Sequence, residues 1–251
     1  MKIFVVADVH GFYDEMKYAL DQAGFDPSNE NHMLVSLGDI VDRGPKPVET
    51  LEYLMSLPRK ILVRGNHEDL AEEMMRTGSY GGHDISNGTW DTFRLFAAHQ
   101  KGFEISRELA VFDWDDVVMR VRHYGLWRKY LESTVNYYET ANHVFVHGWI
   151  PVGPNVIVDW RRYASDVDWE RARWARSPIM ARMCMWDPKG KKLVIGHWHA
   201  SDFHERYNLD LDVDTPFYHP KFIACDACTA RSGFCNVVVI EDERIDGDAT
   251  K

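Results

Sequence analysis

Short apolar runs alternate with amphipathic segments in the N-terminal part of the chain, and a polar turn that contains glycine follows each run. The apolar runs at 2–7, 33–37 and 61–63 predict three buried strands. Between them, 14–23 and 48–57 carry apolar residues at helical spacing and predict two helices. Strands and helices that alternate in this way build a parallel sheet through right-handed crossovers. This rhythm predicts an α/β fold that begins with a parallel half-sheet.

The ends of five predicted strands carry side chains that can bind a metal ion. Those side chains belong to Asp8, His10, Asp39, Asn66, His147, His197 and His199. One histidine alone is more typical of a core or loop position. A set placed after successive strands favours a shared site, because open α/β sheets place their chemistry at the carboxyl ends of strands. Mixed carboxylate, imidazole and amide ligands suit Mn, Fe or Zn better than Ca or Mg. A single carboxylate such as Asp39 can bridge two ions about 3.5–4 Å apart.

The middle of the chain, 76–142, carries a glycine-containing loop and helical patterns at 90–99 and 126–135. Trp and Phe gather on one side of these helical patterns. We therefore expect a helical insert that caps or flanks the metal site. No linker-like composition divides the chain, and 1–251 is expected to form a single domain.

The C-terminal part of the chain returns to short apolar runs, and 222–225 and 236–240 predict closing strands. A segment rich in Trp and Arg precedes them and is expected to consist of helix and loop. Its residues Trp160, Trp169 and Trp174 are expected to pack within a cap rather than to form a cofactor cage.

The net charge of −10 at pH 7 argues against broad electrostatic attraction to nucleic acid or to an anionic membrane. An anionic substrate is compatible with that charge, because bound metal ions can dominate the field of a pocket. No stretch approaches the roughly 18 consecutive apolar residues of a membrane-spanning helix. The N-terminus enters the first strand directly, without the organisation of a signal peptide. We expect a cytoplasmic protein that has no nucleic acid or membrane as partner.

The turns at the strand ends form a series of short motifs. They read Asp8-Val9-His10-Gly11, Gly38-Asp39-Ile40-Val41-Asp42-Arg43-Gly44, Gly65-Asn66-His67-Glu68, Val146-His147-Gly148 and Gly196-His197. The series resembles that of the calcineurin-like metallophosphoesterases over residues 2–240. The second and third motifs resemble the phosphoprotein phosphatase branch, the serine/threonine phosphatases, in its bacterial and phage forms. Weaker similarity lies at 86–90, 137–140 and 225–228.

The resemblance implies a metallophosphatase fold of four layers, in which two mixed β-sheets pack face to face and helices flank them. It also implies two divalent metal ions, in the first place Mn²⁺, with Fe or Zn as alternatives. The implied ligands are Asp8, His10 and Asp39 for the first ion, and Asp39, Asn66, His147 and His197 for the second.

Three further residues match catalytic positions of that family. The resemblance implies that His67 donates a proton to the leaving oxygen, that Asp42 orients and charges His67, and that Arg43 clamps the phosphate. The implied activity is hydrolysis of phosphomonoesters by attack of a metal-bridged hydroxide. Phosphoserine and phosphothreonine on proteins are the first candidate substrates, beside small phosphoesters. A symmetrical diadenosine tetraphosphatase or another nucleotide phosphodiesterase is the alternative. A scaffold that only docks phosphorylated partners is disfavoured, because binding alone needs no proton donor.

Two positions depart from the pattern of the branch. A second phosphate-binding Arg is expected after a Trp, but the comparable stretch 185–190 contains no Arg. The basic residues that could replace it are Lys189, Arg182, Arg161 and Arg162. His199 follows His197 at the alternate position and resembles the second His of the Gly-His-x-His pattern of the wider superfamily. His199 is therefore a candidate additional ligand of the first ion.

Overall fold

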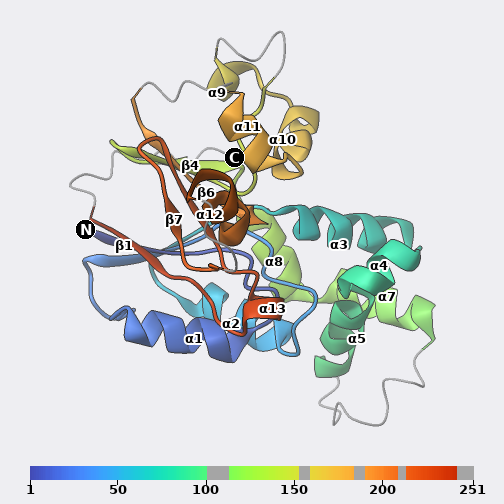
Figure 1. The fold of residues 1–251 in the computed structure, drawn as a ribbon. Coiled ribbons are helices and arrows are strands. Elements are labelled where there is room, and N and C mark those ends of the chain that lie inside the picture. Colours follow the sequence, from blue (N-terminus) through green and yellow to red (C-terminus); the bar gives the residue numbers. More distant parts are fainter. Residues whose placement is uncertain (101–112, 153–158, 184–189, 209–212, 242–251) are drawn as a thin grey trace.

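The computed structural model of the chain describes residues 1–100, 113–152, 159–183, 190–208 and 213–241. These residues form two β-sheets with helices around them (Figure 1). The first sheet has the strand order β3-β2-β1-β9, and the second has the order β4-β5-β6-β8-β7. Two mixed sheets with flanking helices confirm the predicted fold class.

The first sheet follows the rhythm of the N-terminal sequence. Its strands are β1 (Lys2–Val6), β2 (His32–Ser36), β3 (Lys60–Leu62) and β9 (Val238–Glu241). β2 pairs in parallel with both β1 and β3, and Val5 of β1 lies opposite Val35 of β2. The crossovers contain the predicted helices, α1 (Tyr13–Gln22) and α2 (Pro47–Ser56). β9 pairs antiparallel with the free side of β1, so the last described strand closes the sheet at that edge.

The second sheet comes from the C-terminal half of the chain. Its strands are β4 (Tyr137–Glu139), β5 (His143–Val146), β6 (Lys192–His199), β7 (Phe217–Tyr218) and β8 (Phe222–Asp226). β5, β6 and β8 run parallel, whereas β4 and β7 pair antiparallel at the two edges. The register between β6 and β8 shifts between Ile195 and His199, where β6 approaches the candidate site. The family resemblance predicted this sheet, and apolar periodicity alone did not.

Alternate residues of each strand face different cores, because successive side chains of a strand point to opposite faces. Ile3 and Val5 of β1 pack with Val194 of β6 in the core between the two sheets. Phe4 and Val6 point the other way and pack with the helices that cover the first sheet. A third core lies between the second sheet and its own helices. The order is therefore helix, sheet, sheet, helix.

The predicted insert is helical over most of its length. Its helices, with the one that precedes them, are α3 (Asn66–Thr77), α4 (Gly82–Asn87), α5 (Thr89–His99), α7 (Trp114–His123) and α8 (Gly125–Ser133). Phe93 and Trp127 of these helices share one core with α1 and α2. α8 ends before the predicted residue 135, because Val135 forms a parallel bridge with Val63 just after β3, and its N–H donates to the carbonyl of Leu62. That the chain forms a single domain stays a prediction.

The remaining helices lie around the second sheet and its loops. They are α9 (Trp160–Tyr163), α10 (Asp166–Arg173), α11 (Ser177–Arg182), α12 (Ala200–Asn208) and α13 (Thr229–Ser232). Trp160 and Trp169 pack against Tyr137 in the core of this region, as expected. Trp174 differs from that expectation, because it lies in the turn after α10 and 41% of it is exposed.

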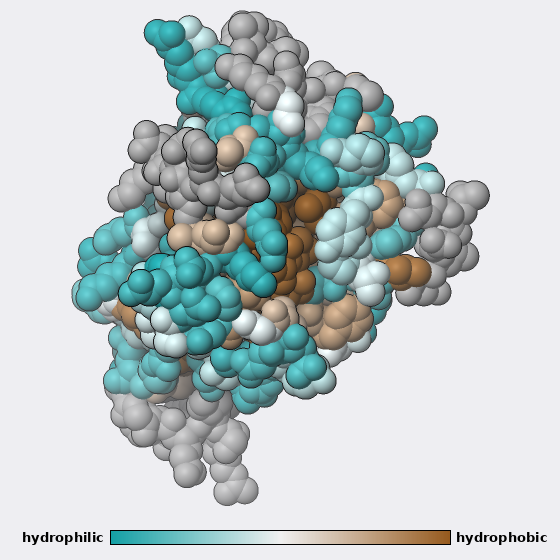
Figure 2. Space-filling view, turned by 90° about the vertical axis from the view of Figure 1, so that its left-hand side faces the viewer, coloured by the Kyte–Doolittle hydropathy of each residue, from teal (hydrophilic) through white to brown (hydrophobic). Residues whose placement is uncertain are grey.

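The surface is predominantly hydrophilic on the face that Figure 2 shows, with a central band of hydrophobic residues. Among the described helices, none combines the length and the apolar character needed to cross a membrane.

Candidate active site

The candidate ligands converge where strands of both sheets end. Asp8 follows β1, Asp39 follows β2, and Asn66 begins α3 shortly after β3. From the second sheet, His147 follows β5 and His197 lies near the end of β6. All of these side chains are buried except that of His197, which is partly exposed. The fold therefore gathers polar groups in a region that excludes most water.

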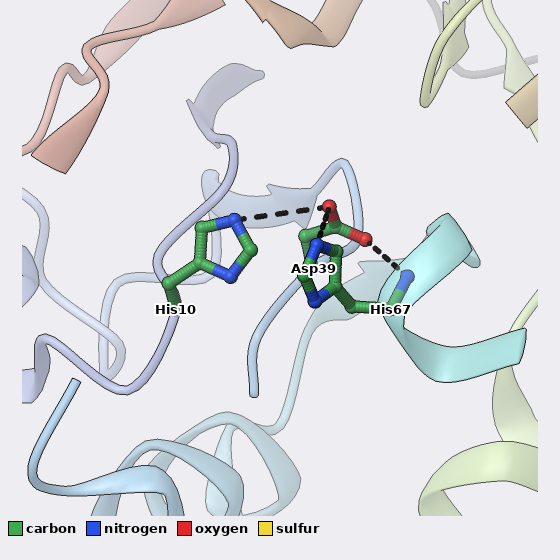
Figure 3. Close-up of side chains that lie close together, drawn as sticks. All are labelled: His10, Asp39 and His67. Atoms are coloured by element: carbon green, nitrogen blue, oxygen red, sulfur yellow. Dashed lines mark hydrogen bonds and ion pairs between the residues drawn. The ribbon is translucent and has the colours of Figure 1, made fainter. Parts of the chain in front are cut away.

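Asp39 lies at the centre of two groups of possible ligands. Its Oδ2 lies 3.8 Å from Nε2 of His10 and 3.8 Å from Nε2 of His67 (Figure 3). Its Oδ1 lies 3.5 Å from Nε2 of His147, and His197 completes that second group. These distances exceed those of hydrogen bonds and suit ligand atoms that each lie about 2 Å from one ion. The two groups share Asp39, although the first contains His67 where the sequence predicts Asp8.

Two histidines are fixed in the tautomer that a metal ligand needs. Nδ1 of His10 donates to the carbonyl of Val41 at 2.8 Å, and Nδ1 of His147 donates to the carbonyl of Leu37 at 2.6 Å. A carbonyl can only accept, so Nε2 of each ring keeps its lone pair for an ion. Burial, aided by the nearby His67, lowers the pKa of His10 well below its ordinary value. A neutral imidazole is the form that binds metal.

Asn66 and His147 make a contact that a cation would stabilise. Oδ1 of Asn66 lies 2.7 Å from Nε2 of His147. In the neutral tautomer that carries the proton on Nδ1, both atoms in this contact are acceptors. Two lone pairs at this distance repel, and a shared cation would remove the repulsion. Burial lowers the pKa of the neighbouring His197 to about 3, which leaves its ring neutral as well.

Three carboxylates meet at this edge of the fold, and one of them was missed in the sequence. Asp8 accepts the backbone N–H of His197 at 2.8 Å. Burial raises the pKa of Asp8, and the charges of Asp226 and Asp39 raise it further. Asp226 ends β8, and burial raises its pKa to about 6. Its signal in the sequence was the weak motif at 225–228, which follows a predicted strand. Clustered, buried carboxylates are a setting that favours a bound cation.

The backbone of the site is strained. Among the described residues, six of the seven non-glycine residues with positive φ are Asp8, His10, Asp39, Asp42, Arg43 and His197. All six belong to the predicted site. Left-handed conformations of such residues cost energy and persist where the surrounding structure imposes them. The strain turns these side chains out of the strand ends and towards one another.

Glu68 shapes the turn that carries Asp39, a role that the sequence did not assign. Its buried carboxylate accepts backbone N–H groups of Asp39 at 2.9 Å, Ile40 at 3.0 Å and Gly65 at 2.7 Å. No residue with a side chain fits in place of Gly65, because a Cβ there would lie 2.1 Å from Oδ1 of Asp39. The third motif therefore supports the second through its glycine and its glutamate.

His67 and Asp42 form the pair that the resemblance predicts. Nδ1 of His67 lies 2.6 Å from Oδ2 of Asp42, and both side chains are buried. Thr89 and Thr92 also donate to the Asp42 carboxylate, at 2.6 Å and 3.0 Å. Thr89 belongs to the weak motif at 86–90, to which the sequence assigned no role, whereas Thr92 lies just beyond that motif. Four hydrogen bonds, one of them from the Asp42 N–H to Thr92, join Asp42 to His67, Thr89 and Thr92 and hold it in one orientation toward His67.

The environment of His67 favours its charged form. Burial alone would lower the pKa of His67, but the carboxylates of Asp39 and Asp42 outweigh that effect and raise it. Arg43 lies beside the ring, with one terminal guanidinium nitrogen 3.3 Å from Nε2, while the residue itself is exposed. Nε2 of His67 thus faces Asp39, which supports its proton, and the cation of Arg43, which opposes it without outweighing the carboxylates. Such a ring can act as a general acid.

The remaining candidates lie apart from this centre or outside the described residues. His199 belongs to neither ligand group, and its two ring nitrogens lie 4.0 Å from carboxylates of Asp226 and Asp202. Arg161 is held by both carboxylate oxygens of Glu139, at 2.7 and 2.8 Å. Arg162 and Arg182 are exposed. Lys189, with the rest of 185–189, lies outside the described residues.

Known proteins share parts of this sequence and its fold. Serine/threonine-protein phosphatase 2 of Escherichia coli is 39% identical over 88 residues, which are 35% of this chain and 39% of that protein. The symmetrical bis(5'-nucleosyl)-tetraphosphatase of Aromatoleum aromaticum is 38% identical over 82 residues, which are 32% of this chain and 29% of that protein. The matched segment therefore spans less than two fifths of the length of either relative.

The wider comparisons cover most of the chain. The crystal structure of a cold-active protein-tyrosine phosphatase from a psychrophilic Shewanella species aligns with a TM-score of 0.57 at 18% identity, over 97% of this chain and 76% of that one. At this identity the similarity concerns the fold. Residues 1–211 match the family of calcineurin-like phosphoesterases. The chain belongs to the calcineurin-like phosphoesterase family.

Proposed function

We propose that the chain is a metal-dependent phosphoester hydrolase that acts on phosphomonoesters. The observation that carries the proposal is the buried pair of His67 and Asp42 beside Asp39, which both ligand groups share. A protein that only binds phosphate needs cations, but it has no use for a proton donor at the same place. The charged form of His67 is supported by two carboxylates, which suits that donor role.

We propose two divalent ions at this site, with Mn²⁺ as the preferred ion. The proposed ligands are Asp8, His10 and Asp39 for one ion and Asp39, Asn66, His147 and His197 for the other, with His199 as a possible addition. Divalent ions at such a site lower the pKa of water and neutralise phosphate oxygens. The neutral histidines, the shared carboxylate and the close acceptors of Asn66 and His147 fit such ions.

Side chains of the protein bind the phosphate, donate the proton and position the proton donor. Arg43 offers a planar fork of N–H groups that matches two oxygens of a phosphate. Nε2–H of charged His67 gives its proton to the leaving oxygen as the phosphorus–oxygen bond breaks. Asp42 accepts the Nδ1–H and holds the ring in place. The two threonines that donate to Asp42 keep that carboxylate from turning away.

Two classes of substrate share this chemistry, because these residues act on the phosphoryl group and on the leaving oxygen. Phosphoserine and phosphothreonine of proteins form the first class, and the similarity to a serine/threonine-protein phosphatase supports it. Symmetrical dinucleoside tetraphosphates form the second class, which is favoured by the similarity to bis(5'-nucleosyl)-tetraphosphatases.

A panel of substrates with the Mn²⁺-loaded protein tests the function. It contains phosphoserine and phosphotyrosine peptides, p-nitrophenyl phosphate, its bis ester and diadenosine tetraphosphate. We expect the monoesters to be hydrolysed faster than the bis ester, whereas a preference for the dinucleotide would select the second class. His67→Asn is expected to keep its bound metal and to lose turnover by orders of magnitude. Absence of hydrolysis across the whole panel would refute the proposed function.

A further inference from the structure

Trp174 stands exposed at the edge of the candidate metal site. Its indole ring lies perpendicular to the ring of His197, at an interplanar angle of 85° and a centroid distance of 6.0 Å. The neighbouring tryptophans of this region, Trp160 and Trp169, are buried, whereas 41% of Trp174 is exposed. Other aromatic side chains of the described residues are as exposed, so exposure alone does not single out Trp174; its contact with the candidate ligand His197 does.

Buried contacts of the preceding residue fix the backbone that carries this exposed ring. Arg173, directly before it, is buried and donates to Asp69 at 2.6 and 3.1 Å and to Asn136 at 2.9 Å. Gly148 follows the candidate ligand His147, and a Cβ at Gly148 would lie 2.6 Å from the carbonyl of Arg173. The backbone that carries Trp174 is thus packed onto the motif that carries the ligand. The backbone that carries the ring is therefore already ordered before a partner binds, which lowers the entropy cost of binding.

Trp174 also lines a groove of about 1030 Å³ beside α3 and α10. Charged side chains such as Glu72, Arg122 and Glu170 line it. On another side, the ring of His83 from α4 lies 6.5 Å from the indole. Trp174 therefore contacts the candidate ligand His197 and also lines a space of ligand size. The groove combines charged side chains with apolar surface from residues such as Leu70 and Met75, which suits a leaving group that has both a flat ring and polar groups.

We propose that Trp174 is a specificity-determining platform that stacks a planar aromatic ring on the leaving group of the phosphoester. The proposal rests on the proposed hydrolase function and ranks aryl and nucleoside phosphoesters above phosphoserine, which has no ring. Stacking is tolerant of the identity of the ring, since every aromatic ring offers a π-face. A phenyl ring and a nucleobase share this chemistry, so both are tested.

The kinetic test compares substrates with and without a ring. For wild type, Trp174→Ala and Trp174→Phe, kcat/KM is measured with p-nitrophenyl phosphate, diadenosine tetraphosphate and phosphoserine. We expect Trp174→Ala to lower the ratio of kcat/KM for each ring-bearing substrate to that for phosphoserine by about tenfold, which equals about 1.4 kcal/mol. The loss should lie mainly in KM, and Trp174→Phe should restore most of the ratio. Tyr18→Ala, which removes an exposed aromatic residue of α1, is the control and should keep the ratio.

A binding test separates this inference from the proposed function. The indole N–H signal of Trp174 is identified by NMR as the signal missing from Trp174→Phe, and adenosine, which has no phosphate, is then titrated. A shift of that signal with adenosine supports the platform even if the protein hydrolyses none of the phosphoesters. Hydrolysis with an unchanged ratio in Trp174→Ala, or an equal loss for phosphoserine, would show that Trp174 supports the site only as a packing residue. If Trp174→Ala lowers the kcat/KM ratio for only one ring type, phenyl or nucleobase, the platform binds that ring type.

Discussion

Glu68→Gln tests whether the candidate site depends on the glutamate that holds its central turn. In the folded chain, Oε2 of Glu68 accepts the N–H groups of Asp39 and Gly65, and Oε1 accepts that of Ile40. A glutamine offers one oxygen, and its amide group can only donate. In its better orientation it leaves the N–H of Ile40 without an acceptor and facing another donor. One orphaned buried donor costs about 1–3 kcal/mol.

We therefore expect Glu68→Gln to lower the free energy of unfolding by about 2 kcal/mol. The measurement is urea unfolding followed by circular dichroism, in chelator so that metal binding does not contribute. Burial raises the pKa of Glu68, so the comparison is made at pH 8 rather than at acidic pH. Glu72→Gln lies one turn further along α3 and is the matched control. Its half-exposed carboxylate pairs with Arg64, and its loss should cost about 0–1 kcal/mol.

The same variant should weaken metal binding. Residues that orient ligands from outside the metal shell contribute about 10–100-fold to metal affinity. We expect a Mn²⁺ titration of Glu68→Gln to show a loss in this range, while Glu72→Gln binds as wild type does. If the two variants unfold and bind Mn²⁺ alike, the hydrogen bonds of Glu68 do not support the site, and the reasoning from its contacts is wrong.

Three further changes test other parts of the site and the fold. Asp39→Asn should abolish binding of both ions, as measured by metal content, and an unchanged content would contradict its shared role. If His199 is a ligand, His199→Ala should lower the occupancy of one ion only, whereas full occupancy of both would exclude it. Burial opposes the ionisation of Glu139, but hydrogen bonds from Arg161 and Lys191 outweigh it and lower its pKa below the ordinary 4.5. The folded state therefore binds this proton less tightly than the unfolded state. The difference in free energy of unfolding between wild type and Glu139→Gln should be constant above about pH 5.5 and should decrease as the pH falls below 4.5. A difference that does not change with pH would contradict the ion pair.

The location of the site could be predicted from the N-terminal rhythm. β1 and β2 run parallel and in register, with Val6 opposite Ser36, so their carboxyl ends fall at one edge of the sheet. Asp8 and Asp39, which follow those strands, therefore had to come close. The apolar runs of the strands and the helices between them therefore predict that Asp8 and Asp39 lie close together. The resemblance to the family added the second sheet, whose strands are short and separated by long segments.

The supporting contacts could not be predicted in the same way. Thr89 and Thr92 reach Asp42 across 47 and 50 residues of sequence, from a helix in the insert. No periodicity links a threonine to a carboxylate at that distance. Gly88 illustrates the same limit: a Cβ there would lie 2.5 Å from the backbone nitrogen of Arg43, a contact visible only after folding. Trp174 was misjudged because composition cannot tell a packed tryptophan from an exposed one.

Backbone strain and buried charge both concentrate at the edge of the first sheet where the site lies. Six site residues adopt left-handed conformations, each at a cost of about 1 kcal/mol, and the sum is comparable with the lower end of the ~5–15 kcal/mol by which folded domains are stable. Asp8 and Asp226 add to that cost, because burial disfavours their charged forms and raises their pKa, whereas at Asp39 the surrounding histidines outweigh burial and lower its pKa. Strands with buried side chains on both faces hold the turns in place and compensate for it. The same cost favours a divalent cation, because an ion at Asp39 neutralises carboxylates that the fold has already brought together. Metal affinity and folding are therefore linked in this chain, and the glycines and threonines that fix the turns serve both.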